Sequence, residues 1–125
     1  MKIFSLEEAN ALLPLVREML LAIQRAHRRL ISMQEAAKHA AEGAELGGGG
    51  MTGGAAYISV LMELASLTSE LDALGVQLKD YERGLIDFPT LRDGRVVLLC
   101  WHLGEGDQIE WWHDVETGFA GRQPL

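Results

Sequence analysis

The stretch that decides the fold runs from Gly84 to His113 and reads GLIDFPTLRDGRVVLLCWHLGEGDQIEWWH. After Gly84 the hydrophobic period changes to two, which is typical of β-strands. Asp93-Gly94 is a strong signal for a tight hairpin, and residues 104–107 predict a second turn. We therefore expect three strands, at about 85–91, 95–103 and 108–113, forming an antiparallel β-meander with the second strand in the centre.

The two turns also predict how the strands are paired. A two-residue loop at Asp93-Gly94 places Asp87 opposite Cys100, and a four-residue loop at 104–107 places Cys100 opposite Trp111 and Leu98 opposite His113. On this register both faces of the meander are largely apolar. A helical hairpin covers only one face of a sheet. We expect a second copy of the chain to cover the other face, which makes the protein a homodimer.

Upstream of the meander, two segments repeat apolar residues every seven positions, as packed helices do. The first predicts a helix over about residues 5–45, opened by a capping box of Ser5 and Glu8 and kinked or broken at Pro14. The second predicts a helix over about residues 55–83, ending at Gly84. Between them, residues 47–54 contain six glycines and no charge, which predicts a flexible connection.

These elements predict an α+β protein: a long antiparallel helical hairpin, then a three-stranded antiparallel β-meander at about 85–113, then a C-terminal tail at 114–125. The chain has 125 residues, of which 48% are hydrophobic, so we expect one domain spanning residues 1–125. The one cysteine excludes a disulfide framework within the chain. Acidic residues near the N-terminus leave no export signal, and no apolar run is long enough to cross a membrane. We expect a cytoplasmic protein.

Charge is unevenly distributed along the chain. Residues 1–46 carry six basic and six acidic side chains, whereas residues 47–125 carry five basic and twelve acidic ones, which gives the net charge of −7. The one basic cluster, Arg25, Arg28 and Arg29, lies in the first helix. We do not expect nucleic-acid binding, because the acidic half would repel a polyanion.

Side chains able to bind a metal are concentrated in and just after the meander. A thiolate, imidazoles and carboxylates together suit zinc or another borderline divalent cation. The candidate ligands are Asp87, Cys100, His102, His113, Asp114 and Glu116. The alternative interpretation is structural: Cys100 is a small buried apolar residue, His102 lies at the rim of the sheet, and Asp114 and Glu116 cap a turn near Arg122.

The chain resembles a small bacterial family of unknown function. The resemblance covers nearly the whole chain apart from the glycine-rich connection. It is carried by the segments FSLEEANALLP (4–14), GVQLKD (75–80), GLIDFP (84–89), CWHLGE (100–105) and WHDVETGFAGRQP (112–124). It implies a small cytoplasmic bacterial protein, and it brings no activity, cofactor or catalytic residue.

Two functional hypotheses remain open. The first is a homodimeric, non-enzymatic binding or structural module, with another protein as a further partner. The second is a metal-binding protein or metalloenzyme that uses the residues named above. Whether the chain is an enzyme is left open by its sequence.

Overall fold

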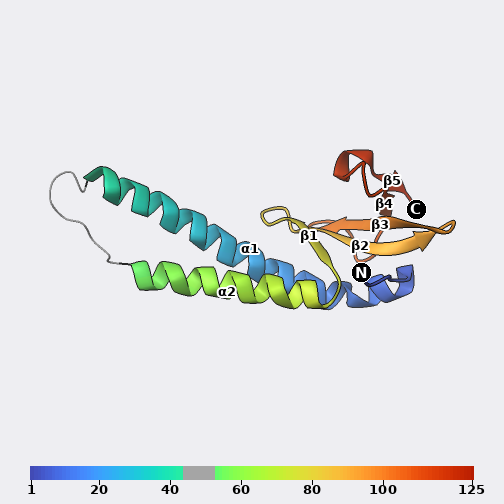
Figure 1. Cartoon of the computed structure of the whole chain (residues 1–125), viewed down its shortest axis with the longest axis horizontal. Helices are drawn as coiled ribbons and strands as arrows, with labels where there is room; N and C mark the ends of the chain where they lie inside the picture. Colours follow the sequence, from blue (N-terminus) through green and yellow to red (C-terminus); the bar gives the residue numbers. More distant parts are fainter. Residues whose placement is uncertain (44–52) are drawn as a thin grey trace.

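The computed structural model describes residues 1–43 and 53–125, and it is an α+β fold (Figure 1). Two helices, α1 (Leu6–Gly43) and α2 (Gly54–Ala73), form an antiparallel hairpin. Five strands follow: β1 (Gln77–Asp80), β2 (Leu85–Arg92), β3 (Arg95–His102), β4 (Trp111–His113) and β5 (Gln123–Pro124), with a short 3₁₀ helix, η2 (Phe119–Gly121), before the last. Residues 47–52 of the predicted flexible connection lie outside the described residues. Within the described ranges, neither helix has a window apolar enough to cross a membrane.

The start of α1 follows the capping prediction. The backbone N–H of Ser5 donates to Glu8 Oε1, and the backbone N–H of Glu8 donates to Ser5 Oγ, both at 3.0 Å. This reciprocal arrangement satisfies two of the N–H groups that a helix start leaves unpaired. Just before it, the N–H of Phe4 donates to the carbonyl of Pro89 at 2.8 Å, which ties the N-terminus to β2. Of the two alternatives expected at Pro14, the break is wrong, because α1 continues through this residue, and the kink stays a prediction.

The second helix is shorter than predicted. The expectation of a helix to about residue 83 is wrong, because α2 ends at Ala73 and residues 77–80 form the edge strand β1. The terminating glycine is Gly75, not Gly84: its φ is +90°, and its N–H donates to the carbonyl of Asp72 at 2.8 Å. A Cβ built on Gly75 would lie 2.8 Å from Lys2 Cβ, so the chain also needs glycine there for space.

The sheet contains the predicted meander but is larger. Strand order is β1-β2-β3-β4-β5, and every neighbouring pair is antiparallel. The expectation of only three strands is therefore wrong: β1 comes from the predicted helix and β5 from the predicted tail. The predicted third strand at 108–113 is reduced to Trp111–His113. The register is confirmed, since Asp87 pairs with Cys100, Cys100 with Trp111, and Leu98 with His113.

Each face of the sheet is covered by a different part of the same chain. The inner face packs on α1 and forms the main core, with Phe88, Leu99, Trp101 and Trp112 among its members. The outer face bears Asp87, Leu98, Cys100 and His113, all buried within the one chain. The segment from residue 114 to β5, which includes η2, lies on this side of the sheet, opposite the helices (Figure 1).

The C-terminal segment on the outer face contradicts one expectation from the sequence. The second face of the meander does not need a second copy of the chain, because the C-terminal segment already buries it. Trp101, which is 1% exposed, belongs to the core against α1. The oligomeric state itself stays a prediction, and any dimer must use another surface.

Two glycines with positive φ allow the cost of backbone strain to be measured apart from the cost of a steric clash. Gly84 has φ +60° and a Cβ there would lie 2.5 Å from Leu103 Cγ, whereas Gly94 has φ +78° and nothing within 4 Å. We expect Gly94→Ala to lower the free energy of unfolding by about 1–2 kcal/mol, the cost of a left-handed conformation. Gly84→Ala should cost at least twice as much in urea denaturation. Equal losses would show that Leu103 moves aside freely.

Candidate functional site

The buried polar residues of the outer face form one cluster on three neighbouring strands. Asp87 on β2, Cys100 on β3 and His113 on β4 are 2%, 0% and 2% exposed. One oxygen of Asp87, the Sγ of Cys100 and one ring nitrogen of His113 all lie within 4.8 Å of one another. A carboxylate, a thiol and an imidazole thus converge where the sheet is otherwise apolar. We call these three residues the outer-face cluster.

The hydrogen bonds of His113 show which ring nitrogen carries a proton in every state of the ring. Nδ1 lies 2.8 Å from the backbone carbonyl of Asp114, which only accepts, so Nδ1 carries a proton. Nε2 lies 3.0 Å from Asp87 Oδ1. With a protonated ring, Nε2 donates to this carboxylate and the two form a buried ion pair. With a neutral ring, Nε2 has a free lone pair directed at the same place.

Cys100 is held in its neutral form. Burial and, to a smaller extent, the negative charge of Asp87 raise the pKa of the Cys100 thiol from 9.0 to about 12. The positive charge of Arg122 opposes this rise. A thiol with that pKa is almost entirely protonated at neutral pH, so it is a poor nucleophile by itself. It becomes a strong ligand only when a cation replaces its proton.

Beside the cluster, an ion pair fastens the C-terminal segment to the sheet. One terminal nitrogen of Arg122 donates to both oxygens of Glu105, at 2.9 and 2.7 Å. The guanidinium also lies over the rings of Trp111 and Phe119, at 4.9 and 4.7 Å from their centroids. Glu105 in addition accepts the backbone N–H of His102 at 3.0 Å. Because Arg122 is in the segment that covers the outer face, this pair helps to keep the cluster buried.

The other three predicted ligands lie elsewhere. His102 is at the rim, with Nδ1 bonded to the carbonyl of Leu103 at 2.7 Å and Nε2 3.7 Å from Glu105. Asp114 pairs with Arg95 at 2.7 Å. Glu116 is exposed. The structure therefore brings together only three of the six expected ligands.

Two pairings in the structure were not expected from the sequence. Asp87 has His113 as its hydrogen-bond partner. Arg122 was expected near Asp114 and Glu116, and it binds Glu105 instead. The signal that could have found the first pair was the register itself. The register placed Asp87 and Trp111 on either side of Cys100. His113 follows Trp111 by two residues, so it lies on the same face of the sheet as Asp87.

The chain belongs to the family described as uncharacterized conserved protein (DUF2203), whose model matches residues 2–125. This confirms the resemblance to a family of unknown function. No curated protein and no solved structure is significantly similar to the chain. Three of the segments that carried the resemblance, at 84–89, 100–105 and 112–124, supply Asp87, Cys100, Glu105, His113 and Arg122 to the outer face.

The protonation of Cys100 has a measurable consequence. Because the thiolate is the reactive form, a pKa near 12 leaves about 1000-fold less thiolate at pH 8 than the ordinary value does. We expect the folded, metal-free protein to react with a disulfide reagent at least about 1000-fold more slowly than the same protein unfolded in urea. A native reaction as fast as the unfolded one would show that the outer face is open.

Proposed function

We propose that this protein binds a divalent transition-metal ion, zinc in the first instance, through Asp87, Cys100 and His113. The observation that carries the proposal is the orientation of His113. Its Nδ1–H is held by a backbone carbonyl and its Nε2 is directed at Asp87 Oδ1, 3.0 Å away. Histidine ligands of metals typically donate their second ring N–H to a carbonyl or carboxylate in this way, which fixes the tautomer that binds.

The charges of the cluster support the same proposal. Without an ion, the carboxyl group of Asp87 and the ring of His113 share a hydrogen bond of 3.0 Å deep in the sheet, where an unpaired charge would be costly. With a divalent cation, the carboxylate and a thiolate from Cys100 supply two negative charges and His113 binds as the neutral ring. The site is neutral in both states, so an ion can replace two protons without leaving a buried net charge.

The spacing of the ligand atoms is near that of a zinc site but wider. Zinc bonds of about 2.0–2.3 Å place neighbouring ligands of a tetrahedral site about 3.5 Å apart, whereas the three atoms lie within 4.8 Å. Closing the site requires side-chain movements of about 1 Å. Three protein ligands leave a fourth position for water or another small ligand, the arrangement typical of catalytic zinc. Any metalloenzyme activity would take place there.

The other hypothesis, a non-enzymatic homodimeric module, does not compete with metal binding. The cluster lies on the sheet and leaves the helical hairpin free for a partner (Figure 1). The basic cluster on α1 offers little to a nucleic acid, since Arg28 pairs with Glu82 at 2.6 Å and Arg29 with Glu63 at 3.9 Å. A cytoplasmic location suits the proposal, because a reducing compartment keeps the Cys100 thiol free.

Metal titration tests the proposed ligand set. The chain, purified without a histidine tag and stripped with a chelator, should bind about one equivalent of Zn²⁺ or Co²⁺, and Co²⁺ should give a thiolate charge-transfer band. Cys100→Ser and Asp87→Asn should each lose more than about 100-fold in affinity, the upper range for losing a group that only supports a ligand. His102→Ala and Glu116→Gln are matched controls outside the cluster and should bind as the wild type does.

Circular dichroism shows whether each variant is folded, so loss of binding and loss of structure are distinguishable. Addition of Zn²⁺ at about 100 times its Kd should stabilise the wild type by about 2.7 kcal/mol and should leave Cys100→Ser unchanged. Sub-stoichiometric binding, or equal affinity in the wild type and Cys100→Ser, would show that the cluster is an ordinary buried Asp87–His113 pair.

The pKa of Cys100 predicts how metal affinity depends on pH. Since that pKa is about 12, the thiol is protonated throughout the range from pH 7 to 9, and each bound ion must displace its proton. The dissociation constant should fall about tenfold per pH unit over this range for that one proton. In Cys100→Ala this contribution of the thiol should be lost, so the slope should be about tenfold per pH unit smaller than in the wild type. Equal slopes in the two proteins would mean that the thiol is not a ligand.

A further inference from the structure

Helix α2 has apolar residues on two sides, and only one of them is covered. The covered side packs on α1 and includes Val60, Leu64 and Leu71, which are the buried residues of α2. A second side carries Ile58, Leu61 and Met62, which are 57%, 45% and 67% exposed. A helix that is apolar on two sides is normally buried between two neighbours. In the described part of the chain, α2 has a helical neighbour on one side.

On the same side of the hairpin, α1 is covered by the turn between β1 and β2 near the sheet, and it is exposed further from the sheet. The turn between β1 and β2 docks there: Gln24 donates to the carbonyl of Glu82 at 2.6 Å, and Tyr81 stacks on His27 with ring centroids 5.1 Å apart. One helical turn beyond His27 along α1 comes Ile31, which is 40% exposed. We call Ile31, Ile58, Leu61 and Met62 the open flank.

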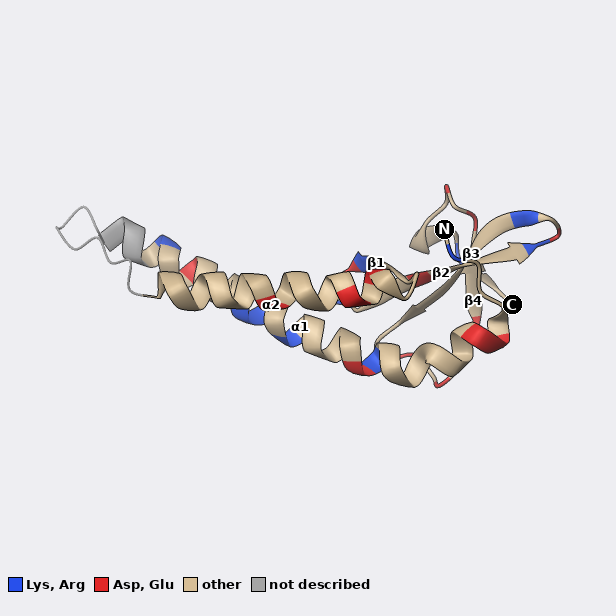
Figure 2. Ribbon diagram, turned by 60° about the horizontal axis from the view of Figure 1, so that its bottom comes forward, with Lys and Arg blue, Asp and Glu red and all other residues tan. Residues whose placement is uncertain are grey.

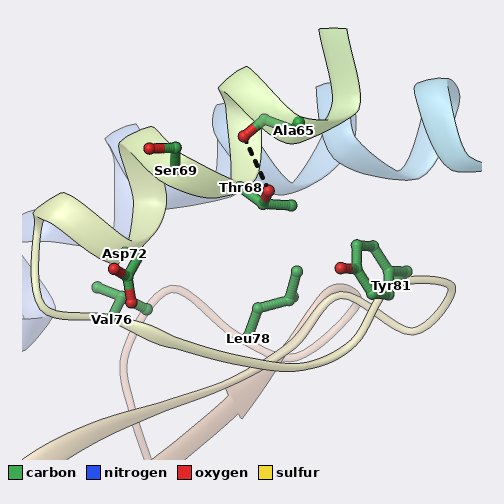
Figure 3. A pocket seen from close by; sticks show the side chains of 7 residues that line it. All are labelled: Ala65, Thr68, Ser69, Asp72, Val76, Leu78 and Tyr81. Carbon is green, nitrogen blue, oxygen red and sulfur yellow. Dashed lines mark hydrogen bonds between the residues drawn. The ribbon is translucent and has the colours of Figure 1, made fainter. Parts of the chain in front are cut away.

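Next to the open flank, α2 borders a groove. Small side chains of α2 (Ala65, Thr68 and Ser69) face Leu78 and Tyr81 across a hollow of about 340 Å³ (Figure 3). The large residues Ile58, Leu61 and Met62 therefore form a ridge on one half of this side of α2, and small residues form a hollow on the other half. Ridge and hollow lie on the same helix, about two turns apart.

We propose that a second copy of the chain packs on this side of the hairpin, ridge into hollow. A twofold axis across α2 between Met62 and Ala65 brings Ile58 of one copy opposite Ser69 of the other, and the reverse. Each ridge then enters the other copy's groove, as the self-complementary patch of a twofold dimer requires. The two hairpins together form a four-helix arrangement.

Charge favours a second copy over a charged partner. The residues Ile58, Leu61, Met62, Ala65, Thr68 and Ser69 of α2 include no acid or base, and Asp72 is the charged residue of α2 that lines the hollow. Glu63 lies on the other side of the helix, where it is 3.9 Å from Arg29. The ribbon of α2 is uncharged over most of its length (Figure 2). A chain of net charge −7 repels its own copy least through such a surface.

The available area is close to what a dimer needs. Residues 54–69 of α2 span about 24 Å, and two packed helices are about 20 Å wide, so the hairpin presents about 480 Å² in projection. The accessible area of a ridged surface exceeds its projection. Specific interfaces bury about 800 Å² per partner. The hairpin alone therefore offers less than a standard interface, and Leu78 and Tyr81, which line the hollow opposite α2, extend the surface.

Sedimentation equilibrium of the full chain tests the proposal. The wild type at micromolar concentration should have twice the mass of one chain. Met62→Glu places a charge on the ridge, and Ser69→Trp fills the hollow. Each should raise the dissociation constant of the dimer at least about 100-fold, because a twofold dimer contains every ridge-to-hollow contact twice and one substitution disrupts both copies. Leu91→Glu is the matched control, since Leu91 is 60% exposed but lies on β2, and it should stay dimeric.

All three substituted residues are exposed, so the variants should keep the wild-type circular dichroism. In a Cys100→Ser background, a mixture of the Met62→Cys and Ala65→Cys chains should form an intermolecular disulfide under oxidation, because the twofold axis places residue 62 of one copy opposite residue 65 of the other. A monomeric wild type at 100 µM, or a dimer that survives both Met62→Glu and Ser69→Trp, would overturn the proposal. Metal titration of the same variants keeps this result separate from the metal site.

Discussion

The backbone pairing of β2 with β3 is the constraint on which the rest of the structure depends. The Asp93-Gly94 turn, with φ of +51° and +78°, joins the two strands and sets their register over eight residue pairs. Side chains alternate between the two faces of the sheet. The pairing therefore sends Ile86, Phe88 and Trp101 to the core against α1 and sends Asp87 and Cys100 to the opposite side. A slip of one residue would exchange the two sets and place a carboxylate in the hydrophobic core.

The β2–β3 hairpin was predictable for this reason, whereas the edge strands β1 and β5 were not. A two-residue turn leaves one register, so the facing of Asp87 and Cys100 follows from the sequence alone. The strand β1 was missed because the seven-residue spacing of Leu64, Leu71 and Leu78 continues past the end of α2. Gly75 could have marked that end, but Gly84 competes as a stop signal when only spacing is considered.

The candidate site was predictable in part for the same reason. The register placed Asp87 and Cys100 together and His113 on the next strand, since these positions are fixed by regular ladders. His102 was included because it shares a strand face with Cys100, and Asp114 and Glu116 because they follow His113 in sequence. The positions of these three side chains depend on turns and on ion pairs such as Asp114 with Arg95, which local patterning does not specify. The cover of the outer face depends on contacts between segments that are distant in sequence, such as Arg122 with Glu105, and residues 114–125 have no periodicity that would reveal them.

The position of Arg122 after the strands that it covers has a consequence for the order in which the fold can form. Asp87, Cys100 and His113 all precede the residues that cover them. Before residues 114–125 close over the sheet, the outer face is exposed to solvent and the Cys100 thiol is in contact with water. Closure of this segment is thus the step that seals the sheet, and an ion reaches the cluster most easily before that step.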